Sequence, residues 1–156
     1  MTGEVIRFTE SDWRVFAAIR LRALIDALGE RDPQYQKESA FTAAQWRRRI
    51  RNHAQFATLV DGRPVGLIAA QQENVDSVYL YSLWLDPDVR GKGLARQLVA
   101  AAVDWARAQH VQTITLRVVA DNLAARAVYE GLGFAFVATA ETAEPRDEVA
   151  MTLSVS

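Results

Sequence analysis

The chain contains no cysteine, only two histidines (His53 and His110) and only two lysines among its 18 basic residues. The absence of cysteine excludes disulfides, thiolate zinc sites, iron–sulfur clusters and a cysteine nucleophile. Two histidines are too few for a three-histidine zinc site, and we expect no metal. A net charge of −1 lacks the basic excess typical of a polyanion binder, so we expect no nucleic-acid partner.

Long apolar runs are also missing. No uninterrupted stretch approaches the ~20 residues needed to span a bilayer, and Met1–Phe8 lacks the basic and apolar segments of a signal peptide. We therefore expect a cytoplasmic protein without a membrane partner. Half of the 156 residues are hydrophobic and 24% are charged, which is typical of a globular protein. The length predicts one domain over residues 1–156.

The order of the apolar patterns predicts a mixed α/β fold. Helical spacing predicts four helices, at about 13–28, 42–52, 94–108 and 122–132. Short apolar or alternating runs predict strands at 5–8, 56–60, 65–70, 78–85, 113–119, 134–139 and 149–153. The run at 78–85 is apolar enough to be buried on both faces, and 30–42 lacks a period and is expected to be a loop. The element order is β-α-α-β-β-β-α-β-α-β-β.

The segment between the expected strand at 78–85 and the next helix carries the most information. It reads Arg90-Gly91-Lys92-Gly93-Leu94-Ala95-Arg96, with its glycines at the helix start. A helix N-terminus exposes unpaired N–H groups and the positive end of the helix dipole, which together bind anions. We interpret the segment as a phosphate-binding loop; glycines that only shape a tight turn are the alternative. The segment lacks the third glycine of a Rossmann fingerprint, because Arg96 stands at that position. It also lacks the Ser or Thr that follows Gly-Lys in a P-loop, because Gly93 stands there.

A second motif follows about 30 residues later and reads Asn122-x-x-Ala125-x-x-x-Tyr129-x-x-x-Gly133-Phe134. Together with Arg90-x-x-Gly93-x-Ala95, it resembles the two hallmark segments of the GNAT superfamily of N-acyltransferases. The order of the motifs, the helix and strand between them, and the element order of nearly the whole chain agree with that family. The resemblance implies the GNAT fold, a central, mostly antiparallel mixed sheet flanked by helices, with acetyl-CoA (coenzyme A) as the cofactor.

The resemblance also implies individual roles. The central strand would splay from its neighbour, the backbone at Leu83 to Leu85 would pair with the pantetheine arm, and an N–H near Leu83 would polarise the thioester carbonyl. Asn122 would contact the cofactor, cap its helix, or do both. Tyr129 would protonate the departing thiolate; an aromatic that packs helix against sheet is the alternative. The implied cofactor-binding residues are Leu83, Trp84, Leu85, Arg90, Gly91, Lys92, Gly93, Leu94, Ala95, Arg96, Asn122, Ala125 and Tyr129.

The general base is less clear, because many family members use a strand glutamate where this chain has Tyr81. A phenol of pKa ~10 is a poor direct base at neutral pH. We favour a water relay held by Tyr81 or Ser82. The alternatives are a base from elsewhere, namely Glu38, Glu141, Asp147 or His53.

In this fold the acceptor is framed by the first two helices, the loop between them and the last hairpin, here residues 26–41 and 140–148. The candidate acceptor-binding residues are Tyr35, Glu38, Phe41 and Tyr81, with Glu38 attracting a cation; a surface loop pinned by aromatics is the alternative. We expect a small-molecule or peptide amine as acceptor. The competing interpretations are a protein N-terminus as the acceptor, or a catalytically silent acyl-CoA-binding module.

The run Arg47–Arg51 is interpreted as a solvated helix face. Exposed edge strands make a homodimer plausible.

Overall fold

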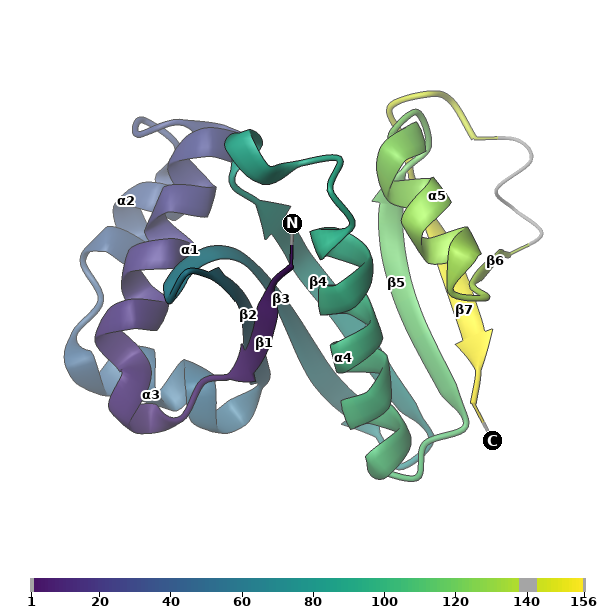
Figure 1. The fold of residues 1–156 in the computed structure, drawn as a ribbon, viewed down its shortest axis with the longest axis horizontal. Helices are drawn as coiled ribbons and strands as arrows, with labels where there is room; N and C mark the ends of the chain where they lie inside the picture. The colour runs from purple at the N-terminus through teal and green to yellow at the C-terminus, as the bar shows by residue number, and fades with distance from the viewer. Residues whose placement is uncertain (1, 138–142, 156) are drawn as a thin grey trace.

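A computed structural model describes residues 2–137 and 143–155 of the chain (Figure 1). Within these residues, a seven-stranded sheet has the strand order β1-β2-β3-β4-β5-β7-β6. Neighbouring strands are antiparallel except for β4 and β5, which run parallel. The strands are β1 (Glu4–Arg7), β2 (Ala54–Val60), β3 (Arg63–Asn74), β4 (Ser77–Leu85), β5 (Thr113–Val119), β6 (Ala135–Phe136) and β7 (Glu148–Ser154). The mixed, mostly antiparallel sheet confirms the expected fold class.

Helices cover both faces of the sheet. α1 (Trp13–Leu28), α2 (Pro33–Ser39) and α3 (Ala43–Asn52) lie on one side, and α4 (Leu94–Ala108) and α5 (Leu123–Gly131) lie on the other. Two short 3-10 turns, η1 (Glu10–Asp12) and η2 (Pro87–Val89), precede α1 and α4. Successive strand residues point to opposite faces of the sheet and pack into two separate hydrophobic cores. In β3, Leu67 packs with α1 and α3, while Ile68 packs with α4. Within the described residues no helix is long and apolar enough to cross a membrane.

The helix α2 corrects the expectation of a loop over 30–42. Asp32 caps it, because its side chain accepts the N–H of Gln34 at 2.8 Å, and Pro33 occupies the first helical position. Glu38 is the buried residue of this helix. A short helix that buries a carboxylate produces no apolar period, and the pattern was therefore misread.

The strand β4 is also less buried than its composition indicates. Its side chains alternate between buried and half-buried up to Leu80, and those at 81–84 are all half-buried. The expectation of burial on both faces was wrong, because Val78 and Leu80 pack into a core on one face while Tyr79 and Tyr81, on the other face, line an open pocket. In the last hairpin, the part of the expected strand at 134–139 that the structure describes is a strand only at Ala135–Phe136, and positions 138–142 lie outside the described residues.

Candidate active site

The site begins where two parallel strands part. Among the described residues, β4 and β5 pair only as far as Leu80 and Leu116, and beyond them the strands diverge (Figure 1). Here β4 also bulges: two residues lie between Tyr81 and Trp84 against a single residue of β3, and Ser82 takes a φ of +60°. A bulge leaves one residue without a ladder partner. The edge of β4 that faces the gap carries unpaired backbone groups because its pairing with β5 ends at Leu80.

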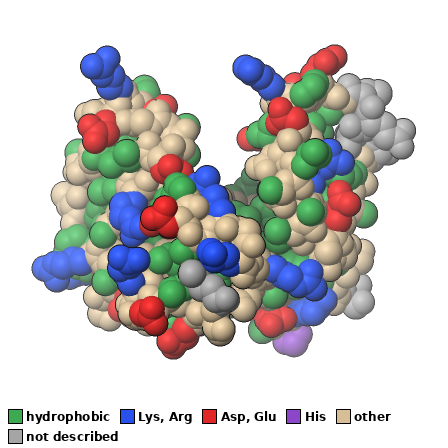
Figure 2. Space-filling model, turned by 45° about the horizontal axis from the view of Figure 1, so that its top comes forward, with side chains coloured by type: hydrophobic (Ala, Val, Ile, Leu, Met, Phe, Trp, Pro, Cys, Tyr) green, Lys and Arg blue, Asp and Glu red, His purple; other side chains and the backbone are tan. Residues whose placement is uncertain are grey.

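Three cavities meet along this gap. A loop cavity of about 500 Å³ lies at the start of α4, a gap cavity of about 240 Å³ lies between β4 and β5, and a helix pocket of about 570 Å³ lies against α1–α3. Leu83, Asn122 and Ala125 line both the loop and gap cavities, and Tyr81 and Ser82 line both the gap cavity and the helix pocket. The shared residues place the three cavities next to one another, and we call this series of cavities the passage. Figure 2 shows the notch between the two halves of the molecule.

The loop before α4 holds two glycines in the left-handed region, with φ of +77° at Gly91 and +84° at Gly93. A Cβ built on either glycine would have nothing within 4 Å, so backbone conformation rather than crowding requires glycine. Gly93 is the N-cap of the 15-residue helix α4 and lines the loop cavity. The first N–H groups of α4 are therefore available to an anion in that cavity.

Arg90 is held by the protein itself. Its Nε–H donates to the carbonyl of Leu85 at 3.0 Å, and its Nη2 donates to Oδ2 of Asp26 at 2.9 Å. The same Asp26 oxygen accepts the Nε1–H of Trp84 at 2.9 Å. The bond from Trp84, opposed by desolvation and reinforced by Arg90, lowers the pKa of Asp26. Arg90 lines the loop cavity, and these contacts tie that cavity to α1.

Asn122, the N-cap of α5, and Tyr129, near the C-terminal end of the same helix, both line the gap cavity. Oδ1 of Asn122 accepts the N–H of Ala125 at 3.2 Å, so the expected N-cap is present while the residue also lines two cavities. Tyr129 is 6% exposed, packs against Phe134 and lines the gap cavity. Burial, and then the nearby Tyr79, raises the pKa of Tyr129 to about 12. Its phenol is therefore neutral and can donate a proton at ordinary pH.

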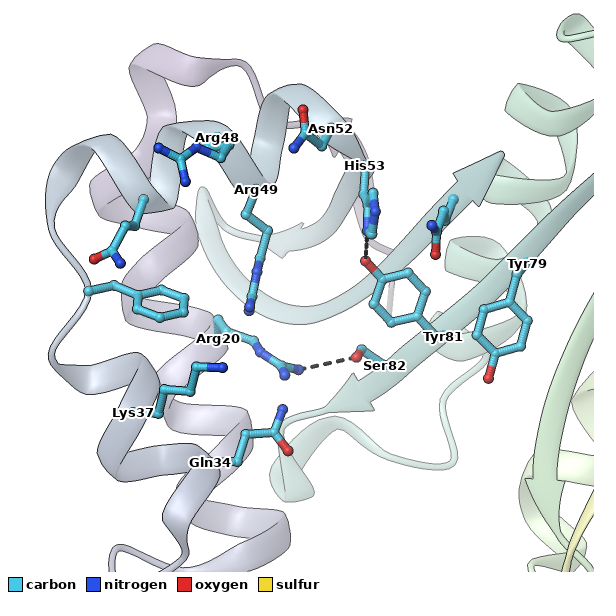
Figure 3. Close-up of a pocket in the computed structure, with 13 residues that line it drawn as sticks. Arg20, Gln34, Lys37, Arg48, Arg49, Asn52, His53, Tyr79, Tyr81 and Ser82 are labelled. Atoms are coloured by element: carbon cyan, nitrogen blue, oxygen red, sulfur yellow. Dashed lines mark hydrogen bonds between the residues drawn. The ribbon is translucent and has the colours of Figure 1, made fainter. Parts of the chain in front are cut away.

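The helix pocket is strongly cationic. None of the 13 residues that line it is acidic, and four are positively charged (Figure 3): Arg20, Lys37, Arg48 and Arg49. Of the acceptor-binding candidates, Phe41 and Tyr81 line this pocket, whereas Tyr35 and Glu38 do not.

The carboxylate of Glu38 lies behind the pocket wall and is 2% exposed. It accepts hydrogen bonds from Nε of Arg20 at 3.0 Å, Nη1 of Arg49 at 2.6 Å and Nε2 of Gln34 at 2.9 Å. Desolvation opposes ionisation, but the bonds from Arg20 and Gln34 and the two arginine charges outweigh it and lower the pKa of Glu38. The expectation that Glu38 attracts a cationic acceptor is therefore corrected, since its oxygens are already engaged.

Asp147, which was also considered as a base, is engaged in a turn away from the three cavities. Oδ2 of Asp147 accepts the N–H of Glu144 at 3.0 Å in a turn, and Asp147 lines none of the three cavities. Glu141 lies outside the described residues. Glu148, at the start of β7, does line the gap cavity.

His53 and Tyr81 form a pair at the inner end of the helix pocket. Nδ1 of His53 is hydrogen-bonded to the hydroxyl of Tyr81, and the two rings meet edge to face (Figure 3). Burial, and then the charge of Arg49, lowers the pKa of His53. Desolvation raises the pKa of Tyr81. At neutral pH a neutral imidazole therefore lies beside a neutral phenol.

The arginine run at 47–51 is only partly the solvated face that we expected. Arg47 lies over the ring of Trp13, and Arg51 is exposed and lies 3.7 Å from Glu10. Arg48 and Arg49, in contrast, line the helix pocket. The α3 helix places these two residues on the side that faces α2.

The model of the acetyltransferase (GNAT) family matches residues 20–134, which is well over half of the chain. The chain belongs to this family. The match includes the strand that splays, the loop before α4 and the segment that carries Tyr129.

Individual relatives agree with this placement. N-acetylaspartate synthetase from Xenopus tropicalis is 33% identical over 87 residues, which cover 55% of this chain and 32% of the relative. Mycothiol acetyltransferase from Nocardiopsis dassonvillei is 34% identical over 113 residues, covering 72% of this chain and 30% of the relative. The chain thus spans about a third of the length of these curated relatives.

Solved structures share the fold. The yncA protein of Salmonella typhimurium, solved with its cofactor acetyl-CoA, has a TM-score of 0.73 and 17% identity, and the match covers 100% of this chain and 95% of that chain.

Most of the predicted cofactor-binding residues line the loop cavity. Of the cofactor-binding candidates, Lys92, Leu94 and Tyr129 do not line the loop cavity; Tyr129 lines the adjoining gap cavity and Leu94 is fully buried. The sequence interpretation missed Ala124 and Val128 in the loop cavity and Arg117 in the gap cavity. Helical spacing from Asn122 could have indicated the first two, because α5 turns the same side toward the cavity at 124, 125 and 128.

Proposed function

We propose that this protein is an acetyl-CoA-dependent N-acetyltransferase that transfers the acetyl group directly to a primary amine. The observation that carries this proposal is the passage through the sheet between β4 and β5. It connects a cavity at a helix N-terminus to a polar pocket on the other face, with the phenol of Tyr129 at its middle. The residues present fit acetyl-CoA, because the loop glycines bring backbone N–H groups to an anion and the parted strands leave an unpaired edge.

Acetyl-CoA supplies the thioester whose acyl carbon accepts the amine. The first N–H groups of α4 bind its phosphates, and the free edge of β4 beyond Leu80 pairs with the amides of its arm. Leu83 lines both the loop and gap cavities and lies in the bulge of β4. Its N–H donates to the thioester carbonyl oxygen as negative charge develops there, which is the usual means of stabilising an oxyanion.

His53 and Tyr81 remove the proton from the acceptor. In the tautomer of neutral His53 that leaves Nδ1 unprotonated, Nδ1 accepts the Tyr81 hydroxyl proton, and the phenol oxygen can then take a proton from the bound ammonium group. The pair replaces the strand glutamate of other family members with a two-residue relay. This proposal replaces the expected water relay held by Tyr81 or Ser82 with a direct relay in which His53 keeps the proton.

Tyr129 completes the reaction on the other side of the gap. As the C–N bond forms and the C–S bond breaks, its hydroxyl donates to the departing sulfur. The second proton on the attacking nitrogen, lost as the amide forms, restores the Tyr129 hydroxyl. The products are an N-acetyl amide and the free thiol, with the first proton of the ammonium group held by His53.

The experiment that tests this proposal is a transfer assay with acetyl-CoA and a panel of primary amines. Free thiol and the acetylated amine are measured together, the second by mass. We expect both in equal amounts with at least one class of amine. Thiol release without an acetylated amine would contradict transfer to an amine. No thiol release with any amine, while acetyl-CoA binds, would leave an acyl-CoA-binding module.

A further inference from the structure

We propose that the helix pocket selects acceptors that carry an anionic group, a carboxylate or a phosphate, on the same small molecule as the primary amine. This inference rests on the proposed function for its chemistry and adds the class of acceptor. It replaces the earlier expectation of a cationic acceptor held by Glu38.

The charges of the pocket carry the inference. Four cationic side chains line it and no acidic one does, and the nearest carboxylate, Glu38, already pairs with both Arg20 and Arg49. Among the described residues, Lys37 and Arg48 form no ion pair, so the cluster retains an excess of three positive charges. Figure 3 shows the side chains of Arg20, Lys37 and Arg49 converging on the same space. A purely cationic amine entering this pocket would be repelled.

The gap cavity next to the helix pocket does not share this excess of positive charge. Glu148 and Arg117 both line it, together with Tyr129, and their charges offset each other. The positive charge is therefore concentrated in the helix pocket. An acceptor with an anion at one end and an amine at the other would place the anion near Lys37 and Arg48 and the amine toward Tyr81 and the gap.

The size of the pocket limits the acceptor. A volume of about 570 Å³ lies within the range of roughly 300–1,000 Å³ typical of small-molecule sites. An amino acid, a short peptide with a free carboxylate or an aminoalkyl phosphate fits this space. The neutral amides of Gln34, Gln45 and Asn52, which also line the pocket, provide further hydrogen-bond donors for the anion.

The experiment uses amines that match in length and differ in charge. The turnover series is β-alanine, propylamine and 1,3-diaminopropane, with 2-aminoethyl phosphate and ethanolamine to separate phosphate from carboxylate. A second measurement titrates the same amines calorimetrically into the protein with CoA in excess. We expect kcat/KM and affinity for one anionic amine to exceed those of its neutral and cationic partners by at least about tenfold.

Three variants locate the effect. Lys37→Gln and Arg48→Gln should each raise KM for the anionic amine about fivefold to tenfold, with kcat and the Kd for acetyl-CoA unchanged. Arg47→Gln removes the same charge from the same helix outside the pocket and is the matched control. An equal change in KM in Arg47→Gln would overturn the assignment to the pocket.

The two proposals fail in different ways. If neutral or cationic amines turn over as well as the anionic ones, the inference about the acceptor is wrong and the transferase stands. If anionic amines bind preferentially but no amine is acetylated, the transferase is wrong and the anion site stands. Binding of no anionic amine together with no turnover contradicts both.

Discussion

Nδ1 of His53 and the hydroxyl of Tyr81 are hydrogen-bonded across 28 residues of sequence, at the point where the helix pocket opens into the gap between β4 and β5. The imidazole comes from the C-terminal end of α3 and the phenol from the bulged strand β4. The pair places a group that can accept a proton beside the position proposed for the acceptor amine.

The pH dependence of turnover should report His53. Because burial and Arg49 lower the pKa of His53 from its ordinary value of 6.5, the base is neutral above that value and becomes protonated only at lower pH. With saturating acceptor, kcat should rise with pH through a pKa below 6.5 and then stay level. In His53→Gln we expect kcat to fall about 100-fold, within the usual range for general base catalysis, and the acid limb to disappear.

Glu148→Gln is the control for this profile, because Glu148 is the carboxylate that lines the gap cavity. The variant should keep the acid limb of the parent protein. Retention of the limb in His53→Gln, together with its loss in Glu148→Gln, would transfer the role of base to the carboxylate.

Removal of the Tyr129 hydroxyl should separate chemistry from binding. Tyr129→Phe keeps the ring that packs against Phe134 and loses the proton donor, so we expect kcat to fall about 100-fold or more. The Kd for acetyl-CoA, measured by calorimetry, should stay within about twofold of the parent value. A kcat within threefold of that of the parent protein would mean that Tyr129 packs against Phe134 and does not donate the proton.

A substitution at Gly93 tests whether the loop before α4 binds the cofactor. Gly93→Ala forces a side chain onto a backbone with a φ of +84°, which costs about 1–2 kcal/mol or shifts the loop. We expect the Kd for acetyl-CoA to rise at least fivefold. Gly62→Ala in the β2–β3 turn has a similar φ of +76° and equally open surroundings, and it should lower thermal stability without changing that Kd. Equal affinity in the two variants would mean that the loop does not bind the cofactor.

Glu38 should matter for stability more than for acetyl-CoA binding. Glu38→Gln leaves Arg20 and Arg49 without their shared carboxylate, and the loss of one partner from such a buried pair costs about 3 kcal/mol. Because the folded pKa of Glu38 is lowered, its contribution is fully present above the ordinary pKa of 4.5 and is lost as pH falls through the folded pKa. Urea unfolding from pH 7 to pH 3 should show this loss in the parent protein and a shallower dependence in the variant.

The local patterns of the sequence predicted most of the fold. The periods of α1, α3 and α4 and the expected cap Asn122 correspond to observed helices and an observed cap. The helix α2 has no apolar period, and its only local signal is the Asp32-Pro33 helix start. The burial of β4 was overestimated, because an apolar and aromatic composition does not reveal that one face of the strand borders a pocket.

The cofactor side of the site could be read from contiguous motifs, and the acceptor side could not. The glycines of the loop and Tyr129 lie in short segments with fixed spacing. The environment of Glu38 depends on Arg20 from α1 and Arg49 from α3, at separations of 18 and 11 residues. Such a contact has no local pattern. The carboxylate therefore appeared available for substrate until the structure showed that it is already paired.

The measurement that tests the central claim most directly is a thermal-shift titration with acetyl-CoA, with free CoA for comparison and NADH as control. A ligand at a hundredfold excess over its Kd adds about 2.7 kcal/mol of stability, which for a domain of this size raises Tm by roughly 5–10 °C. The account predicts such a rise with acetyl-CoA and with CoA and none with NADH. No rise at millimolar acetyl-CoA, or an equal rise with NADH, would contradict it.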